Sequence, residues 1–175
     1  MADMAEVTTN ILLDAFTRVR DGLASQLDGL TADEVLWRPA PDANSIGWLA
    51  WHLTRVQDDH LADLGGVDQA WTGGDWSTRF ALPYDDATVG YGQSSAEVGA
   101  FAVSDTSLLI GYHQAVYELT AQVLGMLQTP QDYERIVDER WDPPVTAAVR
   151  VVSVLGDITQ HFGQLSYVKG LLDQR

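Results

Sequence analysis

An aspartate and a histidine stand four residues apart in the stretch GDITQHFGQL, within one of the most apolar parts of the chain. In a helix this spacing puts Asp157 and His161 on one face, so that a carboxylate oxygen and a ring nitrogen can bind one metal ion. Successive helical residues turn by about 100°, which places a polar stripe within an arc of roughly 80°. Its members are Arg150, Ser153, Asp157, His161 and Gln164. Because buried polar groups must be paired, neutralised or bound to a metal, the stripe predicts an interior pocket.

Two ligands are too few for a metal site, and a second apolar helix offers two histidines as the third. His52 and His60 flank Val56 at about 40° to either side of its seam, so either can reach the interior. Two histidines and one carboxylate suit Zn²⁺ with an open position, and less selectively Fe²⁺, Ni²⁺ or Mn²⁺. The alternative without a metal is that Asp157 and His161 hydrogen-bond each other in the core.

The remaining polar candidates have weaker signals. His113 lies at the edge of a third apolar stripe and is a candidate for lining the pocket. Beside His60, the pair Asp58 and Asp59 is expected to face solvent, and His60 itself to be half-exposed. Arg150 can bind a carboxylate of a ligand, although pairing with an acidic neighbour is favoured. We expect most of four tryptophans in the core, namely Trp37, Trp48, Trp51 and Trp141.

Four apolar patterns with spacings of three and four residues predict four long helices. They cover about residues 6–28, 45–64, 109–126 and 143–172. The third could begin at Ser95 with a kink near Ser104, and Asp142 before Pro143 is a good N-cap for the fourth. Since the fourth helix carries few charges, we expect it in the middle of the bundle.

Short local signals mark the ends of the predicted helices. Thr31 and Glu34 have the spacing of a capping box, and Asn44 or Ser45 can cap the second helix. Two glycines at 65 and 66 end that helix, and residues 65–94 then form a long aromatic-rich connection of the kind that usually serves function. The simplest architecture is an all-α, up-and-down-type four-helix bundle with one long loop between helices 2 and 3, in a single domain over residues 1–175.

Composition excludes several classes of function. The formal net charge is -15, with ten basic residues scattered along the chain, which opposes binding to nucleic acid or to an anionic membrane. The chain has no cysteine, so any thiol chemistry needs an external thiol. The start MADMAEVTTN lacks the features of a signal peptide, and a cytoplasmic location is the default expectation.

Two segments carry a family resemblance that extends in order over nearly the whole chain. The stretches LWRPAPDANSIGWLAWHLTRVQDDH and DITQHFGQLSYVKG resemble the DinB-like metal-binding four-helix family, a superfamily of thiol-dependent transferases. WDPPVT before the last helix is similar to the actinobacterial branch associated with mycothiol. The resemblance implies His52, Asp157 and His161 as the metal ligands, although other branches carry histidine at the position of Asp157.

The resemblance also implies a function. The implied activity is that of a metal-dependent S-transferase, which joins a mycothiol-type thiol to small electrophiles for detoxification or metabolism. The implied cofactor is a divalent metal, most often zinc. Apart from the resemblance, Gln164 lies one turn beyond His161 and can hydrogen-bond the fourth metal ligand or orient a metal-bound carboxylate. Arg150, His113 and His60 are candidates for binding substrate. Members of this family often form homodimers.

Three other functions stay open at this point. A thiol-dependent isomerase of the maleylpyruvate type would use the same site, and so would a metal-dependent hydrolase. A non-catalytic metal-binding or small-ligand-binding stress protein would instead fill the open position with a fourth protein ligand.

Overall fold

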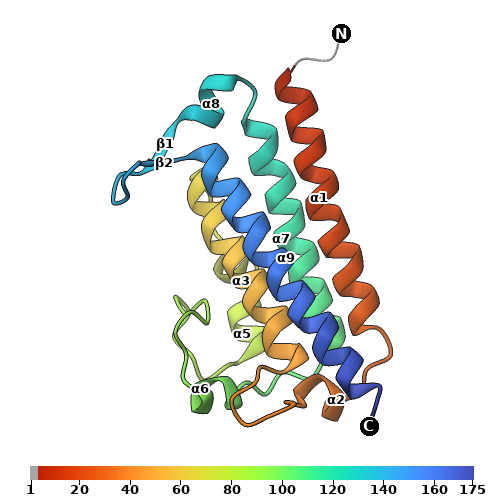
Figure 1. Ribbon diagram of the computed structural model, residues 1–175. Coiled ribbons are helices and arrows are strands. Elements are labelled where there is room, and N and C mark those ends of the chain that lie inside the picture. The colour runs from red at the N-terminus through yellow and green to blue at the C-terminus, as the bar shows by residue number, and fades with distance from the viewer. Residues whose placement is uncertain (1–3) are drawn as a thin grey trace.

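Four long helices form the frame of the computed structural model, which describes residues 4–175 (Figure 1). They are α1 (Met4–Leu27), α3 (Ile46–Gly65), α7 (Thr106–Met126) and α9 (Ala147–Leu172). The all-α four-helix fold predicted from the sequence is confirmed, while residues 1–3 of the predicted domain lie outside the described part. No helix within residues 4–175 is long and apolar enough to cross a membrane.

Short elements connect the long helices. They are α2 (Ala32–Leu36), α4 (Ala70–Gly73), α5 (Trp76–Phe80), α6 (Ser95–Gly99), α8 (Pro130–Glu134) and the antiparallel strands β1 (Ile136–Asp138) and β2 (Val145–Thr146). Three predicted end signals are confirmed. Thr31 and Glu34 form the capping box of α2, the Ser45 side chain accepts from the Trp48 amide, and Gly66 ends α3 in the left-handed conformation.

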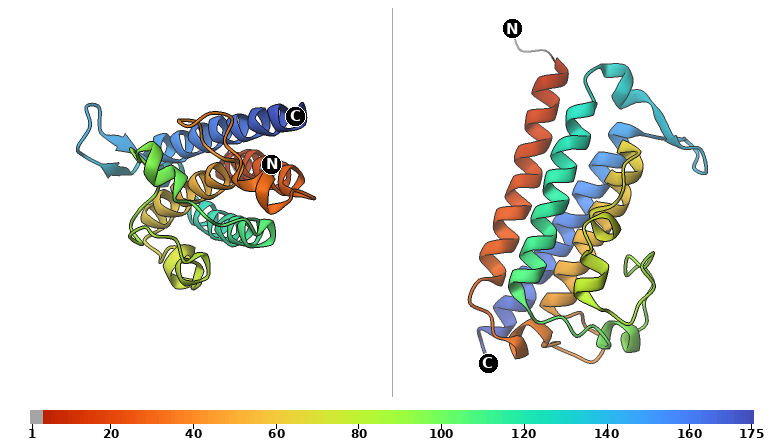
Figure 2. Two further views of the ribbon diagram at one scale, coloured as in Figure 1. Left: turned by 90° about the horizontal axis from the view of Figure 1, so that it is seen from below. Right: turned by 180° about the vertical axis from the view of Figure 1, so that it is seen from behind.

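The directions of the helices differ from the predicted up-and-down order. In Figure 1, α1 and α9 descend, whereas α3 and α7 both ascend. The reason is the connection between α3 and α7, which returns along the outer side of α3 before α7 begins (Figure 2). A connection that crosses the length of a bundle makes the helices it joins parallel.

The most buried helix is α3, and the prediction that the last helix lies in the middle is wrong. Sixteen of the 20 residues of α3 are buried, whereas α9 exposes Val152 and Tyr167. α3 packs on both α7 and α9, and aromatic side chains of the connection cover its remaining side. The Trp51 ring lies 6.5 Å from that of Trp71 and 5.9 Å from that of Phe101.

The range predicted for the third helix is close to that of α7, but its possible start at Ser95 and the predicted start of the fourth helix are wrong for local reasons. α7 begins at Thr106 because Phe101 and Val103 are buried in an extended segment, after which the Asp105 carboxylate caps the helix. α9 begins at Ala147 and not near Asp142. Pro143 precedes a second proline, which disfavours the helical conformation, so this stretch forms the tip of the β1–β2 hairpin and Thr146 caps α9.

Candidate metal centre

The packing of α3 against α9 brings His52, Asp157 and His161 together. Each residue offers one ligand atom, and the three atoms lie within 4.8 Å of one another. The two Nε2 atoms of the histidines are 3.2 Å apart, and Asp157 Oδ1 is 3.7 Å from His161 Nε2. Ligand atoms bound about 2 Å from a tetrahedral ion are separated by roughly 3.3 Å. The spacing of the triad therefore fits one divalent cation.

Hydrogen bonds on the far side of each imidazole support the same interpretation. His52 Nδ1 lies 2.5 Å from the Val89 carbonyl, and His161 Nδ1 lies 2.9 Å from Gln164 Oε1. Both partners accept, so both Nδ1 atoms donate and both Nε2 atoms carry lone pairs. Two facing lone pairs repel unless a cation or a proton lies between them. Histidine ligands of metals are commonly oriented in this way by an acceptor on the other ring nitrogen.

Burial of His52 favours metal binding, while Asp157 and His161 are partly exposed. His52 is 5% exposed, and this burial lowers its pKa, which favours the neutral imidazole that binds metals. Its ring also stacks on Trp48, with the ring centroids 4.7 Å apart. Asp157 Oδ2 is buried and has no hydrogen-bond partner, as expected for a carboxylate arranged to neutralise a cation.

A pocket of about 260 Å³ borders the triad at Asp157. Its other walls come from α3, from the β1–β2 hairpin and from the first turns of α9. The lining residues are Val56, His60, Trp141, Val145, Arg150, Ser153, Val154 and Asp157. The pocket thus combines apolar walls with one guanidinium and one imidazole beside the candidate metal centre.

Arg150 and His60 lie together on the pocket wall. Arg150 pairs with Asp138 at 3.3 Å, which is the kind of acidic neighbour expected, and its Nη1 lies 3.1 Å from His60 Nδ1. Burial lowers the pKa of His60, and the charge of Arg150 lowers it further, so a neutral His60 accepts from Arg150. Hydrogen bonds from Arg140 hold the pKa of Asp138 well below its usual range. Half-exposure of the His60 side chain is confirmed.

His113 lies away from the triad, against α1. It is 2% exposed, and its Nδ1 lies 3.0 Å from Thr54 Oγ1. Burial lowers its pKa to about 4. The cavity that it borders, of about 110 Å³, is lined by residues of α1 and α7 and lacks all three members of the triad.

At the edges of the site, Trp141 is the exception among the four tryptophans expected mostly in the core, and the expectation for Asp58 is wrong. Trp141 is 66% exposed at the hairpin tip and contributes to the pocket rather than to the core. Asp58 is fully buried, although it was expected to face solvent, because groups distant in the sequence bind it. Arg55 and Val89 also belong to the surroundings of the site and were not predicted, because no local pattern distinguishes them; the nearby signal is the glycine at position 90.

Comparisons with known proteins found one family model and a solved structure that match the chain. Residues 11–174 match the family model described as mycothiol-S-transferase. A crystal structure of a conserved protein from Enterococcus faecalis shares 29% sequence identity and superposes with a TM-score of 0.88, covering 95% of this chain and 98% of the other. No curated protein matches the chain.

Proposed function

The chain belongs to the mycothiol-S-transferase family, and on that premise we propose that it is a metal-dependent enzyme that conjugates a mycothiol-type thiol to small electrophiles. The observation that carries the proposal is the triad of His52, Asp157 and His161 beside a pocket. Within residues 4–175, the cluster of possible metal ligands consists of these three residues. Three protein ligands favour a metal site with an open coordination position over one closed by a fourth protein ligand.

The triad supplies the charge that the reaction needs. Two neutral imidazoles and one carboxylate leave a divalent cation with a net charge near +1, which favours an anionic ligand. A cation bound there would lower the pKa of a coordinated thiol, so that the thiolate predominates near neutral pH. Zinc suits this donor set. Nickel, iron or manganese would compete with zinc for the site to an extent set by the availability of each metal in the cell.

The residues of the chain would then orient the two substrates. Gln164 and the Val89 carbonyl hold the two imidazoles, while the pocket between Trp141 and Arg150 accepts the electrophile. In the reaction the thiol gives its proton to solvent, the sulfur forms a bond to the electrophilic carbon, and the leaving group departs with the electrons of its former bond. The role we propose for Arg150 and His60 is to bind a polar oxygen of the substrate, whereas the burial of His113 favours a structural role.

One wall of the pocket is apolar and suits an organic electrophile. Val56, Val145 and Val154 form this wall. A thiol-dependent isomerase would use the same residues and would differ only in releasing the thiol again. We further propose that the chain forms a homodimer, as the apolar side chains exposed on α9 allow.

The test compares the wild-type protein, prepared without a histidine tag, with His161→Ala. We expect about one divalent ion per wild-type chain by elemental analysis, and conjugation of mycothiol to a haloalkyl bimane that depends on this ion. The cobalt-substituted protein should change its visible spectrum when the thiol is added. Thr159→Ala, which alters an exposed residue on the same helix, is the matched control and should behave as wild type. Full activity in the metal-free protein would disprove the proposal.

A further inference from the structure

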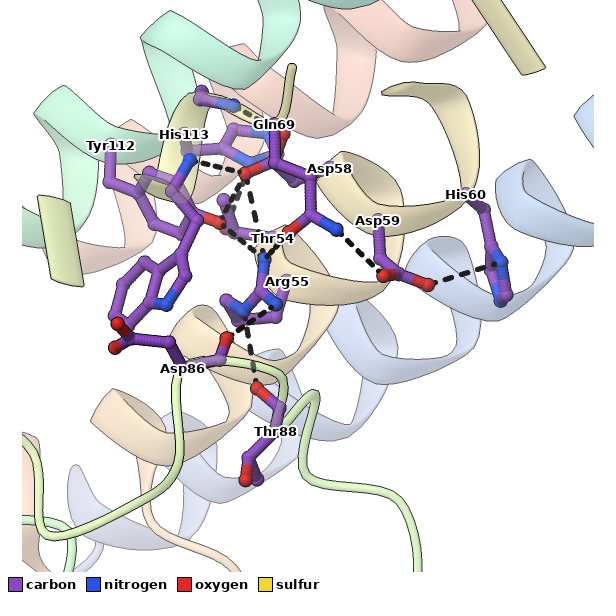
Figure 3. Close-up of polar contacts among 12 residues, drawn as sticks. Thr54, Arg55, Asp58, Asp59, His60, Gln69, Asp86, Thr88, Tyr112 and His113 are labelled. Carbon is purple, nitrogen blue, oxygen red and sulfur yellow. Dashed lines mark hydrogen bonds and ion pairs between the residues drawn. The ribbon is translucent and has the colours of Figure 1, made fainter. Parts of the chain in front are cut away.

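A fully buried ion pair lies on α3, one turn beyond His52. Arg55 and Asp58 are both 0% exposed, with Arg55 Nη1 3.6 Å from Asp58 Oδ2 (Figure 3). The Asp58 carboxylate also accepts from the Ala70 amide at 2.8 Å, the Trp71 amide at 2.7 Å and the Tyr112 hydroxyl at 2.8 Å. Asp58 therefore has three donors besides Arg55, and these fix the start of α4 against α3 and α7.

The guanidinium of Arg55 binds the connection that follows α5. Its Nε donates to the Thr88 carbonyl at 3.2 Å, and its Nη2 donates to the Asp86 carbonyl at 3.3 Å. Nη1 donates to Gln69 Oε1 at 2.9 Å. As Figure 3 shows, one side chain thus reaches from α3 to the backbone of residues 86–88. The planar fork of arginine suits this arrangement, because its donors have fixed directions.

The next two residues of this segment contact the candidate metal ligand. The Val89 carbonyl, one residue after Thr88, accepts from His52 Nδ1. Gly90 follows with a φ of +93°, and a Cβ atom there would lie 2.7 Å from His52 Nδ1. The backbone is therefore pressed closely against the imidazole, at a position where only glycine fits without strain.

From these contacts we infer that Arg55 is a positioning residue, which holds the Val89 carbonyl on His52 and thereby keeps the His52 Nε2 lone pair free for the metal. The inference rests on the metal-binding role proposed above. A neutral imidazole that lacks this acceptor can move its proton to Nε2 and donate to His161 Nε2, 3.2 Å away. That tautomer would occupy the lone pairs of both histidines. Arg55 thus determines the tautomer of His52 through the Val89 carbonyl, without contacting His52 itself.

The test uses Arg55→Met, which keeps much of the side-chain length and removes all its donors. Because Asp58 retains three donors, we expect this variant to fold. Zinc affinity, measured by competition with a chromophoric chelator, should fall about 10-fold to 100-fold, the usual effect of removing a partner of a metal ligand. In the metal-free protein, nitrogen NMR of labelled histidines should show His52 protonated at Nδ1 in wild type and mixed between both nitrogens in the variant.

Two further variants separate this role from general destabilisation. Thr120→Val removes a buried hydrogen bond between α3 and α7, which Gln57 Nε2 donates to Thr120 Oγ1 at 2.7 Å. This variant should leave zinc affinity and the His52 tautomer unchanged. Gly90→Ala should displace the segment from His52 while leaving the ion pair intact, and it should weaken zinc binding as Arg55→Met does. If Arg55→Met does not fold, Arg55→Lys decides the matter, because it keeps the charge beside Asp58 but lacks the fork that reaches both the Asp86 and Thr88 carbonyls. This variant should also weaken zinc binding, and wild-type zinc affinity in it would overturn the inference.

The inference is overturned if folded Arg55→Met or Gly90→Ala binds zinc within about twofold of wild type and keeps the Nδ1 tautomer. A loss of affinity equally large in Thr120→Val would also overturn it. If the wild-type protein binds no metal, the proposed function fails on its own, and the tautomer measurement in the metal-free protein still tests Arg55.

Discussion

The buried neutral His113 predicts an acid-dependent loss of stability that a single substitution should remove. In the folded chain, burial lowers the pKa of His113 to about 4, against 6.5 for a free side chain. Between these values the unfolded chain binds the proton and the folded chain does not. Acidification through this window therefore favours unfolding, and the stability is fully restored above pH 6.5.

The size of the effect follows from the two pKa values. Between pH 7 and pH 5, His113 becomes protonated in the unfolded chain but stays mostly neutral in the folded chain. This difference lowers the free energy of unfolding by about 2 kcal/mol. Below pH 4 the total loss approaches about 3 kcal/mol. His52 and His60, whose pKa values burial also lowers, act in the same direction, so only a difference between variants isolates His113.

The assay is urea unfolding at pH 7 and pH 5, in the presence of a chelator so that metal binding does not contribute. His113→Asn can keep a hydrogen bond to Thr54 and cannot be protonated. We expect wild type to lose about 2 kcal/mol more than this variant between the two pH values. Thr120→Val, which retains His113, should show the wild-type dependence. An equal loss in wild type and His113→Asn would refute the reasoning.

Two further substitutions test the pocket and the buried network. Trp141→Ala should raise the KM for the electrophile several-fold, because this side chain lines the pocket, while metal content stays the same by elemental analysis. An unchanged KM would show that the hairpin tip does not contact substrate. Tyr112→Phe removes the hydroxyl that donates to Asp58 at 2.8 Å and should lower the free energy of unfolding by about 1–3 kcal/mol in urea titrations. An unchanged unfolding midpoint would mean that Asp58 compensates with its other donors.

Local rules predicted much of this fold because they concern neighbouring residues. The capping box at Thr31, the cap at Ser45 and the glycine end of α3 all depend on hydrogen bonds within a few residues. The direction of α7 could not be predicted in this way. It depends on how the connection packs on α3, through aromatic contacts such as that between Trp71 and Tyr112, 5.2 Å apart.

The candidate site shows the same division. The spacing of Asp157 and His161 on one helix was sufficient to pair them, but helical geometry left His52 and His60 equivalent. The structure separates them, since His52 faces His161 whereas His60 contacts Arg150. Asp58 was misjudged because its donors come from residues 12 and more positions away, and no local pattern encodes such partners.

The tip of the β1–β2 hairpin, residues 139–144, is exposed throughout, so the scaffold can vary there. It projects from the bundle in Figure 1 and carries Trp141, and none of the described residues 128–146 belongs to the fully buried apolar core. Changes in its length or composition would thus reshape one wall of the pocket without disturbing the helices that bring the triad together. Divergence of substrate preference among relatives, or its redesign by exchanging this hairpin, could proceed on an unchanged metal centre.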